Sequence, residues 1–186
     1  MPAKKPAPKA SQPFLSDVKT LRARARANMQ KGPVTDSYGA NLEQVLKVLN
    51  DALATETVCV LRYKAHYYGA KGLNAEPAAA EFLEHAQEEQ VHADRLADRI
   101  DQLGGEPDLS PDTLMARSQT EYNTPDDLVD MIKEDLVAER IVIQSYSEII
   151  AWLGHNDPTS RRLFEEILAE EEEHADDMLT LLARTS

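Results

Sequence analysis

Apolar residues recur at helical spacing in four long stretches of the chain. In the first, from about residue 41 to 68, they return every three or four positions and so share one face of an α-helix. These residues are Leu42, Val45, Leu46, Leu49, Leu53, Val60 and Leu61. Stretches from about 77 to 103, 124 to 153 and 158 to 183 have similar length and character. The pattern predicts four helices, each about 40 Å long.

Turn residues mark the ends of these predicted helices. Glycines follow the first three, and Pro77 stands in the first turn of the second. The third and fourth open at Thr124-Pro125 and Asp157-Pro158, where a short polar residue caps the helix and proline occupies its first position. Residues 105–123 form a long connection with about one helical turn, whereas the other two connections are short. The sequence therefore predicts an all-α fold, a four-helix bundle with one long crossover connection.

The first 37 residues differ in composition from the rest. Residues 1–13 are rich in Pro, Ala and Lys and are expected to be disordered. Ser16 is a candidate cap for a short helix over 17–30, which Lys31-Gly32-Pro33 ends. We therefore expect two regions, a flexible basic extension over 1–37 and the bundle over 38–186.

The charge of the 186-residue chain is unevenly distributed. Its net charge is −13, but residues 1–37 carry +6, so the remainder carries −19. An acidic body can concentrate cations, and a basic extension can contact a polyanion. No apolar stretch approaches the roughly 18 residues of a membrane span, and no secretory signal is evident. A single cysteine, Cys59, cannot form an internal disulfide, which favours a cytoplasmic protein without a membrane partner.

The strongest chemical signal is a repeated Glu-x-x-His motif. Glu89-x-x-His92 and Glu171-x-x-His174 each place a carboxylate and an imidazole three residues apart, on one helical face. Glu56 lies 33 residues before the first motif and Glu139 lies 32 before the second, both in nearly apolar stretches. A buried carboxylate needs compensation, and metal coordination provides it. Although any one glutamate of an acidic chain is normally a solvated charge, four glutamates and two histidines in this arrangement predict a two-metal site.

The predicted site would hold two iron or manganese ions, because carboxylates and imidazoles suit these metals. We expect Glu89 and Glu171 to bridge the ions. Glu56 with His92 would complete one metal, and Glu139 with His174 the other. Tyr63, seven residues after Glu56, is the candidate catalytic residue and could hydrogen-bond a bridging carboxylate, or else be an ordinary core tyrosine. Side chains expected outside the site are His66, Cys59 in the core, and His85 at the surface or lining a cavity. Glu170, Glu172 and Glu173 are expected to be mostly solvated, with one or two of them facing an iron-storage cavity.

Four segments resemble the bacterioferritin family, within the ferritin-like superfamily. They are Leu49-Asn50 through Glu56 to Tyr63, Glu89-x-x-His92-Ala93-Asp94-Arg95-Leu96, Asp135-Leu136-x-x-Glu139 and Glu171-x-x-His174. The resemblance covers residues 42–183. It implies that the six residues are the di-iron ligands of a ferroxidase centre, with Tyr63 beside it. It also implies oxidation of ferrous iron by O2 or H2O2 and storage of ferric mineral in an oligomeric cage.

The sequence departs from that family in two places. Where the family has a haem-binding methionine this chain has Gln90, so haem bound in that way is not expected. The chain also ends 12 residues after His174, without room for the short fifth helix of bacterioferritins. That feature resembles the mini-ferritins of the DNA-protecting Dps family, which implies a dodecamer rather than a 24-mer. The basic extension, with Lys4, Lys5, Lys9, Arg22, Arg24 and Arg26, resembles the arms by which some Dps proteins hold DNA.

Two other functions remain open from the sequence. One is a rubrerythrin-like peroxidase or a manganese catalase on the same scaffold, although one cysteine cannot build the additional iron site that rubrerythrins carry. The other is a DNA-binding, Dps-like protein whose iron chemistry is secondary.

Overall fold

The computed structural model of the chain describes residues 16–72 and 75–185, and the predicted disordered segment 1–13 lies outside them. All regular elements in these two ranges are helical. The chain divides into two compact units at the junction between Ser37 and Tyr38. Within the described ranges, no helix combines the length and the apolar character that a bilayer span requires.

The first unit contains helix α1, Val18–Ala27, and a 3-10 turn, Met29–Lys31. The side chain of Asp17 accepts a hydrogen bond from the backbone N–H of Thr20 and caps α1. The prediction that Ser16 caps this helix was therefore wrong by one residue. No side chain of α1 is buried, because this short amphipathic helix has no core of its own to face.

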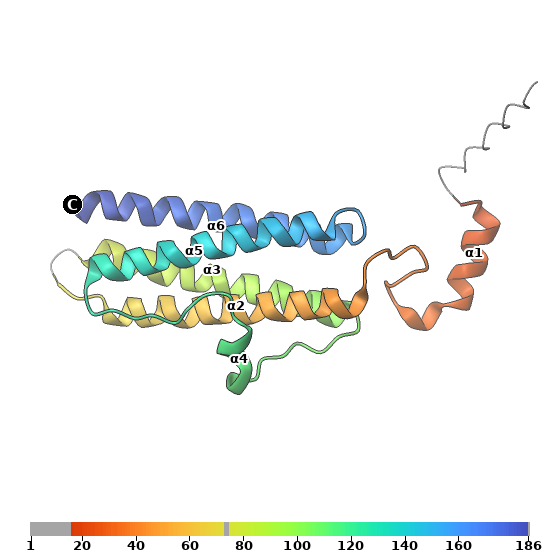
Figure 1. The fold of residues 1–186 in the computed structure, drawn as a ribbon, viewed down its shortest axis with the longest axis horizontal. Helices are drawn as coiled ribbons and strands as arrows, with labels where there is room; N and C mark the ends of the chain where they lie inside the picture. Colours follow the sequence, from red (N-terminus) through yellow and green to blue (C-terminus); the bar gives the residue numbers. More distant parts are fainter. Residues whose placement is uncertain (1–15, 73–74, 186) are drawn as a thin grey trace, which may run out of the picture. The chain divides into compact units, whose positions relative to one another are not determined.

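The second unit is a bundle of four long helices that lie side by side (Figure 1). They are α2 Leu42–Gly69, α3 Ala75–Gln102, α5 Leu128–Leu153 and α6 Pro158–Thr185. Within the bundle, α2 packs mainly on α3 and α5 mainly on α6, and both pairs are antiparallel (Figure 1). The connection from α3 to α5 runs the length of the bundle and contains the short helix α4, Pro111–Arg117 (Figure 1). The predicted all-α bundle with one long crossover is confirmed.

Hydrogen bonds fasten the crossover to α2. Arg117 donates from Nη1 to the backbone carbonyl of Asn50 (2.9 Å), and Asn50 Oδ1 accepts from the backbone N–H of Asp108 (2.7 Å). Further along, the backbone N–H of Gln119 donates to Oγ1 of Thr55 (3.0 Å). These contacts satisfy polar groups that a long loop would otherwise leave unpaired.

Local chemistry at the helix ends agrees with most, not all, of the predicted boundaries. Asp157 caps α6, accepting from the backbone N–H and the hydroxyl of Ser160 (2.9 and 2.7 Å). Helix α5 begins at Leu128 with Asp127 as its cap, so the predicted start at Thr124-Pro125 was wrong. The carboxylate of Asp127 accepts hydrogen bonds from the backbone N–H groups of Val129 and Asp130, which explains why helix α5 starts there.

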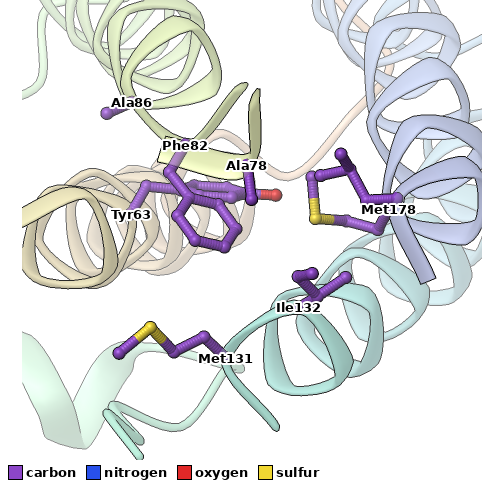
Figure 2. Close-up of a cluster of buried hydrophobic side chains, with 8 residues drawn as sticks. Tyr63, Ala78, Phe82, Ala86, Met131, Ile132 and Met178 are labelled. Atoms are coloured by element: carbon purple, nitrogen blue, oxygen red, sulfur yellow. The ribbon is translucent and has the colours of Figure 1, made fainter. Parts of the chain in front are cut away.

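The interior of the bundle is charged at its middle and apolar toward both ends. Figure 2 shows an apolar cluster that adjoins the charged middle. Its members are Tyr63, Ala78, Phe82, Ala86, Met131, Ile132, Met178 and Leu181. Tyr63 belongs to this cluster through its ring and reaches the charged middle through its hydroxyl. Leu61, which the helical pattern placed on the buried face, is 48% exposed.

Candidate metal centre

The bundle brings all six predicted ligands together. They form two overlapping sets in which the ligand atoms lie within 4.8 Å of one another. One set is Glu56, Glu89, His92 and Glu171, and the other is Glu89, Glu139, Glu171 and His174. Glu89 and Glu171 are common to both sets, the position predicted for bridging carboxylates. Metal binding by these residues stays a prediction.

Each long helix contributes to this cluster. Helix α2 supplies Glu56 and α5 supplies Glu139, each from a nearly apolar turn. Helix α3 supplies Glu89 and His92, and α6 supplies Glu171 and His174, because residues three apart share a helical face. All six are buried, none more than 3% exposed.

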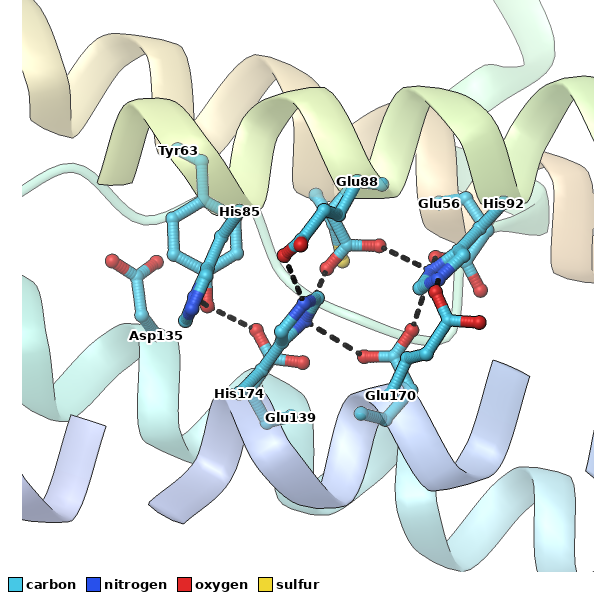
Figure 3. A network of polar contacts seen from close by, with 12 residues as sticks. Glu56, Tyr63, His85, Glu88, His92, Asp135, Glu139, Glu170 and His174 are labelled. Atoms are coloured by element: carbon cyan, nitrogen blue, oxygen red, sulfur yellow. Dashed lines mark hydrogen bonds and ion pairs between the residues drawn. The ribbon is translucent and has the colours of Figure 1, made fainter. Parts of the chain in front are cut away.

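The histidine Nδ1 atoms face the shared carboxylates. Nδ1 of His92 lies 3.0 Å from Oε1 of Glu171 and 3.4 Å from Oε2 of Glu89. Nδ1 of His174 lies 3.6 Å from Oε1 of Glu89 and 3.7 Å from Oε2 of Glu171. Each imidazole therefore points one nitrogen at the same pair of carboxylates, from opposite ends of the cluster (Figure 3).

Buried polar atoms without a hydrogen-bond partner concentrate in the six residues. Eight such atoms belong to them: Glu56 Oε2, both oxygens of Glu89, His92 Nδ1, Glu139 Oε2, both oxygens of Glu171, and His174 Nδ1. Buried polar groups in proteins are normally paired, so this concentration needs an explanation. Oxygen and imidazole donors that converge without protein partners fit a pair of divalent metal ions.

The electrostatics of the cluster shift the pKa of every member. Burial, together with the neighbouring carboxylates Glu171 and Glu89, raises the pKa of Glu56 and of Glu139 well above the ordinary value. Burial opposes a charge on His174, but the carboxylates of Glu171 and Glu89 outweigh it and raise its pKa to about 12. The pKa of His92 is raised for the same reason.

The pKa values of the two shared carboxylates, Glu89 and Glu171, shift in the opposite direction. Burial raises the pKa of Glu89, but the favourable interactions of its carboxylate with Glu56, His174 and His92 outweigh burial and lower it. The pKa of Glu171 is lowered in the same way by His174 and His92. Without metal these shifts favour the charged forms of Glu89 and Glu171 and the protonated forms of Glu56, Glu139, His92 and His174. Two divalent cations would balance four carboxylates and leave both imidazoles neutral.

Two further glutamates, not predicted to take part, orient the imidazoles. Glu88 of α3 accepts from Nε2 of His174 on α6 (2.9 Å), and Glu170 of α6 accepts from Nε2 of His92 on α3 (2.8 Å) (Figure 3). A hydrogen on Nε2 leaves Nδ1 free to coordinate a metal. The sequence signal was available, since both motifs extend to Glu-Glu-x-x-His. The expectation that Glu170 is mostly solvated was therefore incomplete.

Two tyrosines reach the cluster from opposite ends. The hydroxyl of Tyr63 donates to Oε1 of Glu139, and that of Tyr146 donates to Oε1 of Glu56. Tyr63 therefore contacts Glu139, a carboxylate that belongs to one set only. The prediction was a contact with a carboxylate common to both sets. Tyr146 was missed, although it follows Glu139 by seven residues, as Tyr63 follows Glu56.

A buried charged network lies next to Glu139. Arg62 donates from Nε to Oδ1 of Asp135 (2.8 Å), and its Nη2 lies 3.9 Å from Glu139 Oε1. His66 contacts the second oxygen of Asp135 through Nδ1 (2.8 Å). His66 thus lies outside the six-residue cluster, as predicted. Cys59 is fully buried, and Gln90, at the haem-methionine position, is exposed and donates to Asp94 (2.9 Å).

Known proteins are similar to this chain in fold and in sequence. The family model of the ferritin-like domain matches residues 46–186, which include the six clustered residues. The DNA protection during starvation protein of Pyrococcus furiosus is 32% identical over 145 residues, 76% of this chain and 78% of that protein. A dodecameric thioferritin of Bacteroides fragilis, a bacterioferritin-related protein, aligns with a TM-score of 0.75 at 31% identity, over 79% of this chain and 89% of that one. The bacterioferritin of Desulfovibrio desulfuricans, with its di-iron site, aligns with a TM-score of 0.68 at 26% identity, over 76% and 80%.

Proposed function

Because the chain belongs to the family of proteins with a ferritin-like domain, we propose that it is a ferroxidase that oxidises and stores iron. One observation carries the proposal: eight buried ligand atoms without partners converge from four helices within one chain. The likeness to the di-iron bacterioferritin of D. desulfuricans supports iron as the metal.

The proposed reaction balances with two ferrous ions as substrate and one oxidant. Each ferrous ion gives one electron, and two electrons with two protons convert O2 to H2O2, or H2O2 to two waters. The protein's part is to hold two ions close together, so that both electrons are available to one oxidant molecule.

The side chains have distinct parts in this proposal. Glu89 and Glu171 would contact both ions and reduce their mutual repulsion. Glu56 with His92, and Glu139 with His174, would hold one ion each. Glu88 and Glu170 position the imidazoles through Nε2, while the hydroxyls of Tyr63 and Tyr146 hold the two outer carboxylates.

Storage of the oxidised product requires an enclosed space, which one bundle does not provide. We propose assembly into a dodecameric cage, as the B. fragilis thioferritin is dodecameric and aligns over most of this chain. Light scattering of the purified protein tests the subunit number, and a mass near that of 24 subunits would contradict it.

The substitution Glu89→Gln tests the ferroxidase. It keeps the size of a fully buried side chain but removes a charge common to both metal sets. Rapid ferrous oxidation, followed by stopped-flow absorbance, should be abolished while the assembly keeps its size. The control is Glu76→Gln, an exposed glutamate of the same helix that lies outside the cluster, which should oxidise iron at the normal rate. Unchanged kinetics in Glu89→Gln would refute the proposed centre.

DNA contact by the basic extension is a second candidate function. Arg22, Arg24 and Arg26 are exposed on α1, and the P. furiosus relative is a DNA protection protein. Multiplied over a cage, weak phosphate contacts would add by avidity and weaken with salt. A gel-shift comparison of the full chain with a variant lacking residues 1–37 tests this. Absence of binding by the full chain at low salt would end the hypothesis.

A further inference from the structure

Three side chains, Arg62, Asp135 and His66, form a buried triad beside the candidate metal centre. Arg62 is 1% exposed, and the other two have no exposed surface. Nε of Arg62 donates to Oδ1 of Asp135 (2.8 Å), and Nδ1 of His66 lies 2.8 Å from Oδ2 of the same carboxylate. The triad approaches the predicted ligands through Arg62, whose Nη2 lies 3.9 Å from Oε1 of Glu139. Figure 3 shows Asp135 at the opposite end of the cluster from His92.

The hydrogen bonds of the triad determine its net charge. Nε2 of His66 lies 3.1 Å from the backbone carbonyl of Asn123, which can only accept, so Nε2 carries a hydrogen. Nδ1 of His66 and Oδ2 of Asp135 share a second hydrogen, because two lone pairs facing each other at 2.8 Å would repel. On whichever atom that hydrogen resides, His66 and Asp135 together are neutral. The guanidinium of Arg62 is always charged, so the triad as a whole carries one positive charge.

The half of the centre around Glu56 lacks the three residues of the triad. Helices α2 and α5 repeat with an offset of 83 residues, which relates Glu56 to Glu139 and Tyr63 to Tyr146. The positions that correspond to Arg62, His66 and Asp135 are Ser145, Ile149 and Ala52. Among the residues that the structure describes, Glu56 has an ion-pair contact with His92 alone (3.7 Å). The triad is therefore a departure from the internal repeat that adjoins one half only.

We propose that the buried triad makes the two halves of the centre unequal toward ions of different charge. A trivalent ion is held less well between Glu139 and His174, close to the triad, than between Glu56 and His92. The repulsion between the triad and an ion rises in proportion to the charge of the ion, so the triad opposes ferric iron more than ferrous iron. The triad thus acts on metal selectivity without touching the ion.

In a ferroxidase this inequality would give the oxidised product an order of release, a role that rests on the proposed function. Oxidation adds one positive charge to each ion and so increases its repulsion from the triad. The ferric ion beside Glu139 would leave before the one beside Glu56. The preference of the Glu139 half for ions of lower charge does not depend on the reaction.

Gallium(III), supplied as its citrate complex, is a trivalent probe that is not reduced as ferric iron is, and zinc(II) is the divalent reference. The test variant is His66→Asn. Its amide N–H can still donate to Asp135, but it brings no shared hydrogen, so the carboxylate and Arg62 balance each other and the triad becomes neutral. Arg62, Tyr63 and the six predicted ligands stay in place.

The matched control is Asp135→Asn, which changes the triad without changing its net charge. The new amide can accept from Nε of Arg62 and donate to Nδ1 of His66. His66 then keeps a single hydrogen, the one on Nε2 that the carbonyl of Asn123 requires, and is neutral. The one positive charge of Arg62 remains.

Anomalous diffraction measures the occupancy of both halves in crystals of the metal-free protein soaked with a limiting amount of each ion. In His66→Asn, the ratio of occupancy beside Glu139 to occupancy beside Glu56 should rise about tenfold more for gallium than for zinc. One unit of charge at about 10 Å changes an equilibrium by roughly this factor when the effective dielectric constant is about 20. Asp135→Asn should match the unmodified protein.

Each other outcome has a definite meaning. Equal shifts for gallium and zinc, or no shift, overturn the proposal and leave the ferroxidase standing. A shift in Asp135→Asn as large as in His66→Asn also overturns it, because net charge would then not be the cause. Absence of both ions from both halves contradicts the ferroxidase proposal and this inference with it. If His66→Asn does not fold, Arg62→Gln with Asp135→Asn removes the same unit of charge from the other end of the triad, and should give the same shift.

Discussion

The half of the centre around His92 and the half around His174 contain the same kinds of side chain. Each has a glutamate from a helix without a motif histidine, a histidine that points Nδ1 inward, a carboxylate on Nε2 and a tyrosine. The tyrosine hydroxyl holds the glutamate of its own half in both cases. This likeness follows the internal repeat of the sequence, in which corresponding residues lie at nearly the same separation.

The surroundings of the two halves differ. Beside His92, Glu170 is held by Arg95 (3.2 Å), which also pairs with Glu166 (2.7 Å). Beside His174, Glu88 has no lysine or arginine partner among the residues that the structure describes, and a cavity of about 180 Å³ lined by acidic and histidine side chains opens there. The repeat thus explains the ligands, whereas the departures from it give the two halves different charged surroundings. Four predictions test this contrast.

The largest expected effect is the pH dependence of metal loading. In the metal-free protein the raised pKa values of Glu56, Glu139, His92 and His174 favour their protonated forms, and a metal must displace the protons that they hold. Metal entry should therefore release protons, and the number released should fall as the pH rises through the raised pKa values.

Metal affinity should therefore rise with pH, since the metal-free form holds the protons. Calorimetric titration with zinc in buffers of different ionisation enthalpy measures the release at each ion. If the halves are chemically equal, the first and second ions release equal numbers of protons. Release that is independent of pH would contradict the proton assignment for the metal-free cluster.

The next largest effect concerns the arginine near each half. Arg62, beside Glu139, is 1% exposed and pairs with Asp135, which also contacts His66. The substitution Arg62→Met would leave a buried carboxylate poorly compensated, and should lower the free energy of unfolding by about 3–5 kcal/mol. The matched control Arg95→Met removes an arginine whose side chain is 27% exposed, and should cost about 0–1 kcal/mol. Urea unfolding of the metal-free proteins, followed by circular dichroism, measures both, and equal losses would contradict the contrast.

The ligand set of the centre could be predicted from sequence because helical spacing is regular. Glu89 and His92 share a face whatever surrounds them, and the same holds for Glu171 and His174. The glutamates at 56 and 139 stood out because charge in an apolar turn needs a partner. The long crossover followed from connection lengths, which depend on proline and glycine more than on packing.

The side chains around the centre could not be predicted in the same way, because their contacts depend on how the helices are rotated against each other. Glu88 and Glu170 each cross to the opposite helix, a contact that no spacing within one helix specifies. His85 directly follows the exposed Glu84, yet it is buried because it lies four residues before Glu89 and so shares its face. The start of α5 was wrong because several capping residues compete over 124–127, and Asp127 makes the hydrogen bonds.

A smaller effect distinguishes Glu88 from Glu170, the two carboxylates that accept hydrogen bonds from Nε2 of the histidines. Glu88→Ala should weaken the metal held by His174, and Glu170→Ala the metal held by His92, each by roughly 10–100-fold, because a histidine without its Nε2 acceptor is poorly oriented. Crystals soaked at limiting cobalt should show the anomalous peak of one half reduced in each variant. Glu84→Ala, an exposed change on the same face of α3, is the control. Loss from the same half in both variants would contradict the crossed pairing.

The smallest effect distinguishes the two tyrosines. Tyr63→Phe removes the partner of both Glu139 and His85 Nδ1, whereas Tyr146→Phe removes the partner of Glu56 alone. Each buried group left unpaired costs about 1–3 kcal/mol, so Tyr63→Phe should lower the melting temperature of the metal-free protein more than Tyr146→Phe. The control Tyr68→Phe, at a side chain 75% exposed, should change it little. If both buried variants melt at the same temperature, the contact between His85 Nδ1 and the hydroxyl of Tyr63 contributes nothing measurable to stability.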